Sequence, residues 1–127
     1  MSFVAKQSIA FGGSLALALL IIWGTLTPQN IPDAGDLPVD KLLHAAAFAA
    51  YVLPTALFYP RGLWFVLGFG VLLGAAIELI QPAVGRSGDW ADFVADILGL
   101  ALGWSFGRTV AALVRGKARR DADAPHS

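Results

Sequence analysis

The chain has 127 residues, of which 57% are hydrophobic and only 14% charged, and its nine basic and nine acidic side chains leave no formal net charge. Because a soluble domain carries roughly 25% charged residues, this composition excludes an ordinary soluble domain, and we expect no nucleic-acid partner. The absence of cysteine excludes disulfides, thiol catalysis and cysteine-ligated metal.

Four apolar segments are long enough to cross a bilayer, since about 20 apolar residues span a hydrocarbon layer of roughly 30 Å. We therefore predict an all-α membrane protein in which residues 1–114 form a single four-helix transmembrane bundle. The helices are expected at about residues 9–26, 41–59, 63–81 and 90–114. The polar and basic residues 115–127 are expected to form a disordered cytoplasmic tail.

The first segment, residues 9–26, follows Lys6 and resembles a signal peptide in outline. Its apolar core is longer than the roughly 7–15 residues of such a peptide, and no convincing cleavage site follows Trp23, so we predict a retained helix. The next residues, 27–39, contain three prolines and predict an irregular loop, in which Asp33 and Asp36 are expected to be solvated.

The second segment, residues 41–59, contains Pro54, which predicts a kink that neighbouring helices accommodate. Residues 59–62 predict a tight turn. The third segment ends at Gln81 because Pro82 follows it. A short connection then leads to the fourth segment, which begins near Asp89 or Trp90.

The distribution of lysine and arginine predicts the orientation of the bundle. With both termini in the cytoplasm, seven basic residues lie inside and two outside, which fits the positive-inside rule. Most acidic residues then lie at the outer face. The inner basic residues are Lys6, Arg61, Arg108, Arg115, Lys117, Arg119 and Arg120, whereas Lys41 and Arg86 lie outside.

Polar residues gather at the predicted outer ends of three helices, where spacings of three and four place them on common faces. A charged side chain within hydrocarbon costs about 2.5–3.5 kcal/mol on insertion scales, so such residues are candidates for a functional site. We expect them to face one pocket just beneath the outer surface. They are Asp40, Lys41 and His44 in the second helix, Glu78 and Gln81 in the third, and Asp89, Asp92 and Asp96 in the fourth.

Structural roles compete with this interpretation. Asp40 and Asp89 are each equally well explained as helix N-caps, and Lys41 as a side chain that extends outward to water. The short side chains of Glu78 and Asp96 reach water poorly from their predicted depth, as does that of Asp92, which favours a functional or buried-network role. His44 is open to three roles: ligand, acid/base group or structural hydrogen-bond partner.

Arg86 lies between Gly85 and the Ser87–Gly88 pair, where small residues allow a bound anion to approach and a guanidinium can fork onto phosphate. The alternative is that Arg86 neutralises Glu78 or Asp92 and joins two helices.

Glycines at spacing four indicate close helix packing in lipid. Gly99, Gly103 and Gly107 form one such ridge on the fourth helix, and Gly70 and Gly74 form a shorter one on the third. The alanines at positions 45–47, 49 and 50 are suited to receive a ridge.

The motifs Asp40-Lys41-x-x-His44 and Glu78-x-x-Gln81, followed by Arg86, Asp92 and the Gly99/Gly103 helix, resemble the VanZ-like family of small bacterial membrane proteins. The resemblance covers roughly residues 26–107. One departure is Asp96, where the family usually has asparagine, which adds a possible charge to the pocket.

The resemblance implies a multi-pass protein of the bacterial inner membrane, in a family named for low-level resistance to the glycopeptide teicoplanin. It favours binding or processing of an anionic envelope lipid or a polyprenyl-linked cell-wall precursor. The alternative is a structural subunit, within an oligomer or with an envelope-protein partner, whose polar residues form a latch between helices. Whether the protein is an enzyme stays open, as do its cofactors and any metal, although the carboxylates suit a hard cation such as Mg²⁺. Candidate catalytic residues are His44, Glu78, Asp92 and Asp96, and candidate ligand-binding residues are Asp40, Lys41, Gln81 and Arg86.

Overall fold

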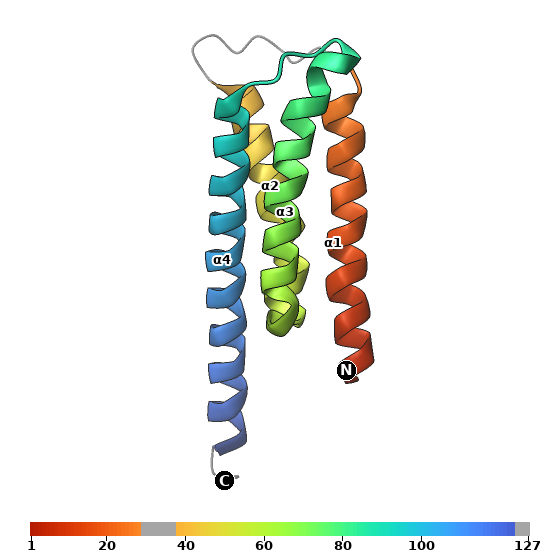
Figure 1. The fold of residues 1–127 in the computed structure, drawn as a ribbon. Helices are drawn as coiled ribbons and strands as arrows, with labels where there is room; N and C mark the ends of the chain where they lie inside the picture. Colours follow the sequence, from red (N-terminus) through yellow and green to blue (C-terminus); the bar gives the residue numbers. More distant parts are fainter. Residues whose placement is uncertain (29–37, 124–127) are drawn as a thin grey trace.

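The computed structural model describes residues 1–28 and 38–123, and within these ranges all regular secondary structure is helical. Four helices are long and apolar enough to cross a membrane, which confirms the predicted all-α, four-helix membrane protein (Figure 1). They are α1 (Phe3–Leu26), α2 (Val39–Phe58), α3 (Leu63–Ile80) and α4 (Trp90–Asp123), with short 3-10 turns η1 (Pro60–Gly62) and η2 (Gln81–Val84). Asp33 and Asp36 lie outside the described residues.

Two helix ends differ from the prediction. Helix α1 begins at Phe3 rather than near residue 9, because the Ser2 hydroxyl caps it by accepting a hydrogen bond from the Ala5 amide at 3.2 Å. Helix α4 continues to Asp123, so the prediction of a disordered tail is wrong for residues 115–123. This stretch is rich in alanine, arginine and lysine, which are good helix formers, and basic side chains near a helix C-terminus interact favourably with its dipole.

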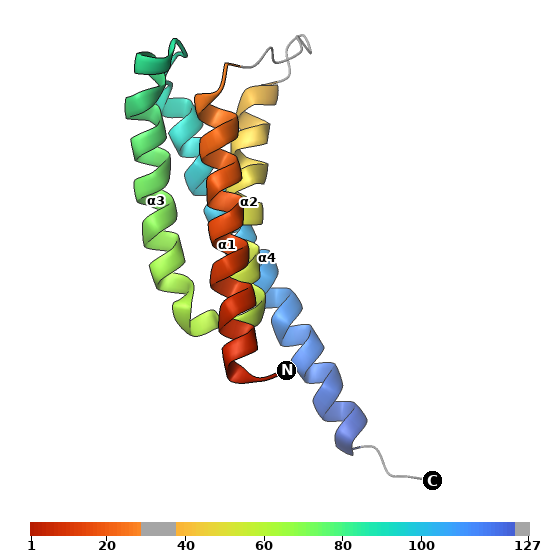
Figure 2. The same cartoon turned by 90° about the vertical axis from the view of Figure 1, so that its right-hand side faces the viewer.

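The helices run roughly along one axis, and α4 extends well past the others (Figures 1 and 2). The N-terminus and the C-terminal end of α4 lie at the same end of the bundle. The opposite end contains the N-termini of α2 and α4 and the C-termini of α1 and α3, and we call it the polar end. Helix α2 packs against both α1 and α4, and its Phe48, Tyr51 and Val52 form the centre of the apolar core.

Large apolar side chains also cover the outside of the bundle. Trp64, Phe65 and Leu79 are each more than three-quarters exposed, an arrangement that would be unfavourable in water over so wide an area. In a bilayer these side chains contact lipid tails, which fits four membrane-spanning helices.

The predicted glycine ridge is the packing surface of α4. A Cβ atom added at Gly99 or Gly103 would collide with the backbone carbonyl of Ala45 or Ala49 on α2, so the two helices pack backbone against backbone there. Gly107 also lies close to α2, where its neighbour is the side chain of Ala56. This confirms the structural role predicted for the ridge.

Polar contacts tie α1 to α2 near Pro54, which lies inside α2. The Ser14 hydroxyl donates to the carbonyl of Tyr51 at 2.8 Å and is 3.1 Å from the hydroxyl of Thr55. Gly13 lies against the Pro54 ring, where an added Cβ would be 3.0 Å from the proline Cβ. The sequence interpretation had not singled out Ser14 or Thr55.

A tight connection brings the start of α4 onto the end of α3. Turn η2 ends at Gly85, whose φ of 78° is left-handed and therefore suits glycine. Gly88 then passes so close to α3 that an added Cβ would be 2.5 Å from the carbonyl oxygen of Glu78. This close approach places Asp89 directly beside the Glu78 side chain.

Candidate functional site

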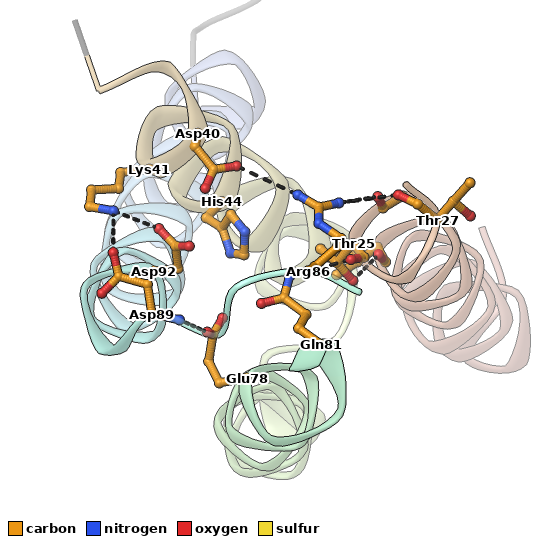
Figure 3. A network of polar contacts seen from close by, with 12 residues as sticks. Thr25, Thr27, Asp40, Lys41, His44, Glu78, Gln81, Arg86, Asp89 and Asp92 are labelled. Atoms are coloured by element: carbon orange, nitrogen blue, oxygen red, sulfur yellow. Dashed lines mark hydrogen bonds and ion pairs between the residues drawn. The ribbon is translucent and has the colours of Figure 1, made fainter. Parts of the chain in front are cut away.

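The structure brings all eight predicted site residues to the polar end of the bundle, where they belong to three helices and the turn and loop that follow α3 (Figure 3). Their hydrogen bonds and ion pairs form several neighbouring sets, which the acidic side chains around His44 bring close together. The residues are Asp40, Lys41, His44, Glu78, Gln81, Arg86, Asp92 and Asp96.

Lys41 joins α2 to α4. Its ammonium donates to Asp89 Oδ2 at 2.8 Å and to Asp92 Oδ1 at 3.0 Å. The Lys41 side chain is 38% exposed, whereas that of Asp92 is only 4% exposed. Lys41 is therefore held across the helix pair while it stays partly exposed, so of its two sequence interpretations the structure favours a member of the polar group over a side chain that only extends outward to water.

Asp89 caps α4, as one of its two sequence interpretations predicted. Its Oδ1 accepts a hydrogen bond from the amide of Ala91 at 2.9 Å. Its own amide donates to Glu78 Oε2 at 2.7 Å, which links the cap to α3. The hydrogen bonds from Lys41 and from the Ala91 amide hold the pKa of Asp89 below its ordinary value.

Asp40 does not cap α2. The helix begins at Val39 after Pro38, so Asp40 already lies within the first turn, where a carboxylate still interacts favourably with the helix dipole. Its Oδ1 faces the Arg86 guanidinium at 3.9 Å. The N-cap interpretation of Asp40 is therefore wrong, because α2 begins one residue before Asp40, at Val39, directly after Pro38.

Arg86 fixes the end of α1. Its Nη1 donates to the carbonyls of Gly24 and Thr27, both at 3.2 Å, and such carbonyls at a helix C-terminus have no partner within the helix. The carboxylate beside Arg86 belongs to Asp40, so the alternative that Arg86 neutralises Glu78 or Asp92 is wrong. Figure 3 shows the guanidinium between Asp40 and the end of α1.

His44 and Asp96 form a buried pair between α2 and α4. The distance from His44 Nδ1 to Asp96 Oδ1 is 2.8 Å, and the two side chains are 4% and 0% exposed. Gly74 of α3 makes room for this carboxylate, since an added Cβ there would be 2.8 Å from Asp96 Oδ2. The aspartate fixes the orientation of the imidazole ring.

Two groups of acidic residues share His44. One consists of Asp40, His44 and Asp92, and the other of His44, Glu78 and Asp96. In each group, one possible ligand atom from every residue lies within 4.8 Å of the other two. These residue types are suitable metal ligands.

A groove with a volume of about 280 Å³ lies between α1 and α2 and reaches the polar end. Its polar end is formed by Asp40, His44 and Arg86, and its walls are apolar. Leu20 and Leu43 line the groove and are more than half exposed, so the groove opens sideways onto the lipid-facing surface. The other apolar lining residues are Leu17, Ile21, Ala47, Phe48 and Ala50.

The sequence interpretation missed the contribution of α1 to this end of the bundle. The carbonyl of Thr25 accepts a hydrogen bond from Gln81 Nε2 at 3.3 Å, and the carbonyls of Gly24 and Thr27 hold Arg86. These acceptors belong to the backbone, so no residue type could have revealed them. The one available signal was that the carbonyls at the end of any helix need partners.

Comparison with known proteins gives one result. A model of the VanZ/LLP1 family matches residues 4–112, which include all of α2 and α3, nearly all of α1 and the larger part of α4. No curated protein and no solved structure matches the chain.

Proposed function

This chain belongs to the VanZ/LLP1 family of membrane proteins, and on that premise we propose that it binds an anionic envelope lipid at the outer face of the bacterial inner membrane. A lipid-linked cell-wall precursor is a ligand of this class. The observation that carries the proposal is the groove between α1 and α2, which is polar at one end and apolar along its walls. This is the distribution of polarity in a lipid headgroup and its tail.

Arg86 is the residue that would bind the anionic head. Two carbonyls of α1 hold its Nη1 in place, so the side chain is already ordered. Its Nη2 is 3.9 Å from Asp40, too far for a strong hydrogen bond, and this side of the guanidinium faces the groove region. An ordered guanidinium whose Nη2 makes no hydrogen bond to the described residues suits a phosphate, which a guanidinium contacts through two parallel hydrogen bonds.

The apolar walls would hold the part of the lipid tail nearest the head. Ligand pockets for small molecules typically measure about 300–1,000 Å³, so a groove of about 280 Å³ accommodates only a segment of a lipid. The exposed Leu20 and Leu43 at its edge allow the rest of the tail to remain in the bilayer. A lipid would therefore enter sideways.

The many carboxylates near the site do not oppose this arrangement. Among the described residues that line the groove, Asp40 is the one carboxylate, and it faces Arg86. Asp89 and Asp92 are paired with Lys41, and a carboxylate oxygen of Asp92 also lies within 4.8 Å of ligand atoms of Asp40 and His44. An anionic head at this end of the groove would therefore meet Arg86 and His44, with Asp40 facing Arg86 and Asp92 paired with Lys41.

The pair of His44 and Asp96 favours a second candidate, an acid/base reaction on the bound lipid. A histidine oriented by a buried carboxylate through one ring nitrogen is a common arrangement for a general base. His44 also lines the groove, so it would be close to a bound headgroup. A link to glycopeptide resistance would follow if the lipid were the cell-wall precursor that those antibiotics bind.

Native mass spectrometry of the detergent-purified protein tests lipid binding. We compare the wild type with Arg86→Ala, with Ala47→Phe, which narrows the groove, and with the control Arg61→Ala, an exposed basic residue beyond α2. We expect a retained phospholipid or polyprenyl-phosphate mass in the wild type and the control, and its loss from both groove variants without loss of folding.

Two results would contradict the proposal. One is the absence of lipid from every sample. The other is a lipid retained by Arg86→Ala together with a lower melting temperature, which would support the structural latch instead.

A further inference from the structure

Three buried oxygen atoms at the polar end have no hydrogen-bond partner in the described part of the chain. They are Glu78 Oε1, Gln81 Oε1 and Asp96 Oδ2. The three residues are only 8%, 1% and 0% exposed. Native proteins leave few buried polar atoms unpaired, and each such atom calls for a partner such as an ion or an ordered water.

With Glu78 and Asp96 ionised, all three atoms are acceptors, so their missing partner is a donor or a cation. The nearby basic side chains already have partners. Lys41 donates to Asp89 and Asp92, and Arg86 holds α1 and faces Asp40. Neither can move to the unpaired oxygens without breaking contacts that join two helices.

The charge balance of the polar end points in the same direction. Five carboxylates stand against two permanent cations, Lys41 and Arg86, which leaves three negative charges in excess, or two if His44 is protonated. A divalent cation would remove most of this excess in an environment of low dielectric constant. The five carboxylates belong to Asp40, Glu78, Asp89, Asp92 and Asp96.

We propose that His44, Glu78 and Asp96 bind a divalent transition-metal ion of the Zn²⁺ or Mn²⁺ kind between α2, α3 and α4. One ligand atom from each residue lies within 4.8 Å of the other two. On a tetrahedral ion with metal bonds of about 2.0–2.2 Å, ligand atoms lie roughly 3.3–3.6 Å apart, so the group would close by up to about 1.5 Å around an ion. One imidazole and two carboxylates fit these ions better than Ca²⁺, which takes oxygen ligands.

The second acidic group, Asp40 with His44 and Asp92, is the weaker candidate. Its two carboxylates already face cations, Asp40 next to Arg86 and Asp92 on Lys41. Two of the three unpaired buried oxygens belong instead to Glu78 and Asp96, and the third belongs to the neighbouring Gln81.

The metal site goes beyond lipid binding. Glu78 and Asp96 are not among the residues that line the groove, so the ion would bind with or without a lipid. His44 belongs to both regions, and an ion on it would add positive charge next to the end of the groove. Lipid retention and metal binding are therefore measured separately, and either proposal can fail without the other.

The test begins with protein purified in detergent, treated with a chelator and then titrated with Mn²⁺ or Zn²⁺. Elemental analysis after removal of free metal gives the stoichiometry, and the melting temperature reports stabilisation by the bound ion. We expect one ion per chain and a higher melting temperature in the wild type. Glu78→Gln and Asp96→Asn should weaken metal affinity at least tenfold, since each removes a charged ligand and keeps the size of the side chain.

Two controls make the assignment specific. Asp40→Asn, in the competing group, and Ser14→Ala, a buried polar residue far along α1, should both bind metal as the wild type does. The electron paramagnetic resonance spectrum of Mn²⁺ bound to the wild type should show a nitrogen ligand. This measurement uses the wild type alone, so it does not depend on the folding of any variant. Absence of metal from the wild type, a spectrum without nitrogen, or loss of metal in Asp40→Asn but not in Glu78→Gln would each overturn the proposal.

Discussion

Helices α2 and α4 are held together by two regions of opposite chemistry. Along most of their length, glycines of α4 pack against the backbone of α2, with Gly99 on Ala45 and Gly103 on Ala49. At the polar end, charged side chains join the same helices, through Lys41 and through the pair of His44 and Asp96. We call the first region the glycine contacts and the second the polar contacts.

The glycine contacts and the polar contacts contribute differently to the packing of α2 against α4. The glycine contacts bring the helices close, but their spacing of four is repeated, so a shift by one turn would place Gly103 on Ala45 and preserve much of the packing. The polar contacts are not repeated, and such a shift would break them. Buried polar groups that specify one alignment of two helices are known from coiled coils.

Alignment alone does not require every charge at the polar end. The Lys41 bridge to Asp92 already distinguishes one alignment from its neighbours. The buried carboxylates of Glu78 and Asp96 cost free energy and leave two oxygens unpaired. Helix packing does not need these two buried carboxylates, and for this reason we assign Glu78 and Asp96 a function.

The largest effect should come from breaking the glycine contacts. Gly103→Leu forces a side chain into the backbone of Ala49, and we expect a loss of about 3 kcal/mol in the free energy of unfolding, the upper end of overpacking effects. Gly68→Leu is the matched control, because nothing lies within 4 Å of a Cβ at that glycine. Unfolding in a denaturing detergent series measures both. Equal stability of the two variants would show that α2 and α4 do not pack closely.

An intermediate effect is expected from the polar contacts. Lys41→Met removes the ammonium and leaves the buried Asp92 without its cation, at a cost of about 1–2 kcal/mol for a half-buried charged hydrogen bond. The control Lys6→Met changes an exposed lysine of α1 and should leave the melting temperature unchanged. A melting temperature that falls equally in both variants would remove Lys41 from the set of helix-joining residues.

The smallest predicted change in stability concerns Asp89, which both caps α4 and pairs with Lys41. Asp89→Asn keeps an oxygen that can cap α4 and removes the charge, whereas Asp89→Ala removes both, so the alanine variant should melt at the lower temperature. The pKa of Asp89 is lowered in the folded protein, so its charge stabilises the fold above the ordinary aspartate pKa and loses this effect as pH falls through the lowered value. The difference between the wild type and Asp89→Asn should therefore shrink from pH 7 to pH 3. A difference that grows toward low pH would contradict the ion pair with Lys41.

Much of the fold and part of the site followed from the sequence. Hydropathy predicted the four helices, and spacings of three and four predicted which polar residues share a face. The pairing of His44 with Asp96 did not follow, because it depends on the alignment of α2 with α4, which the distant contacts of Gly99 and Gly103 help to set. The partners of Arg86 could not be predicted from the sequence either, since two of them are backbone carbonyls of α1.

Helix α4 has 34 residues and is therefore about 51 Å long, whereas the hydrocarbon layer measures about 30 Å. A helix that begins at one edge of this layer is thus about 20 Å longer than the layer is thick, and Figure 2 shows that α4 extends past the other helices at the end opposite the site. Asp92 and Arg119 lie near opposite ends of this helix, so a label attached at Arg119 would be far from the site and would not touch its residues.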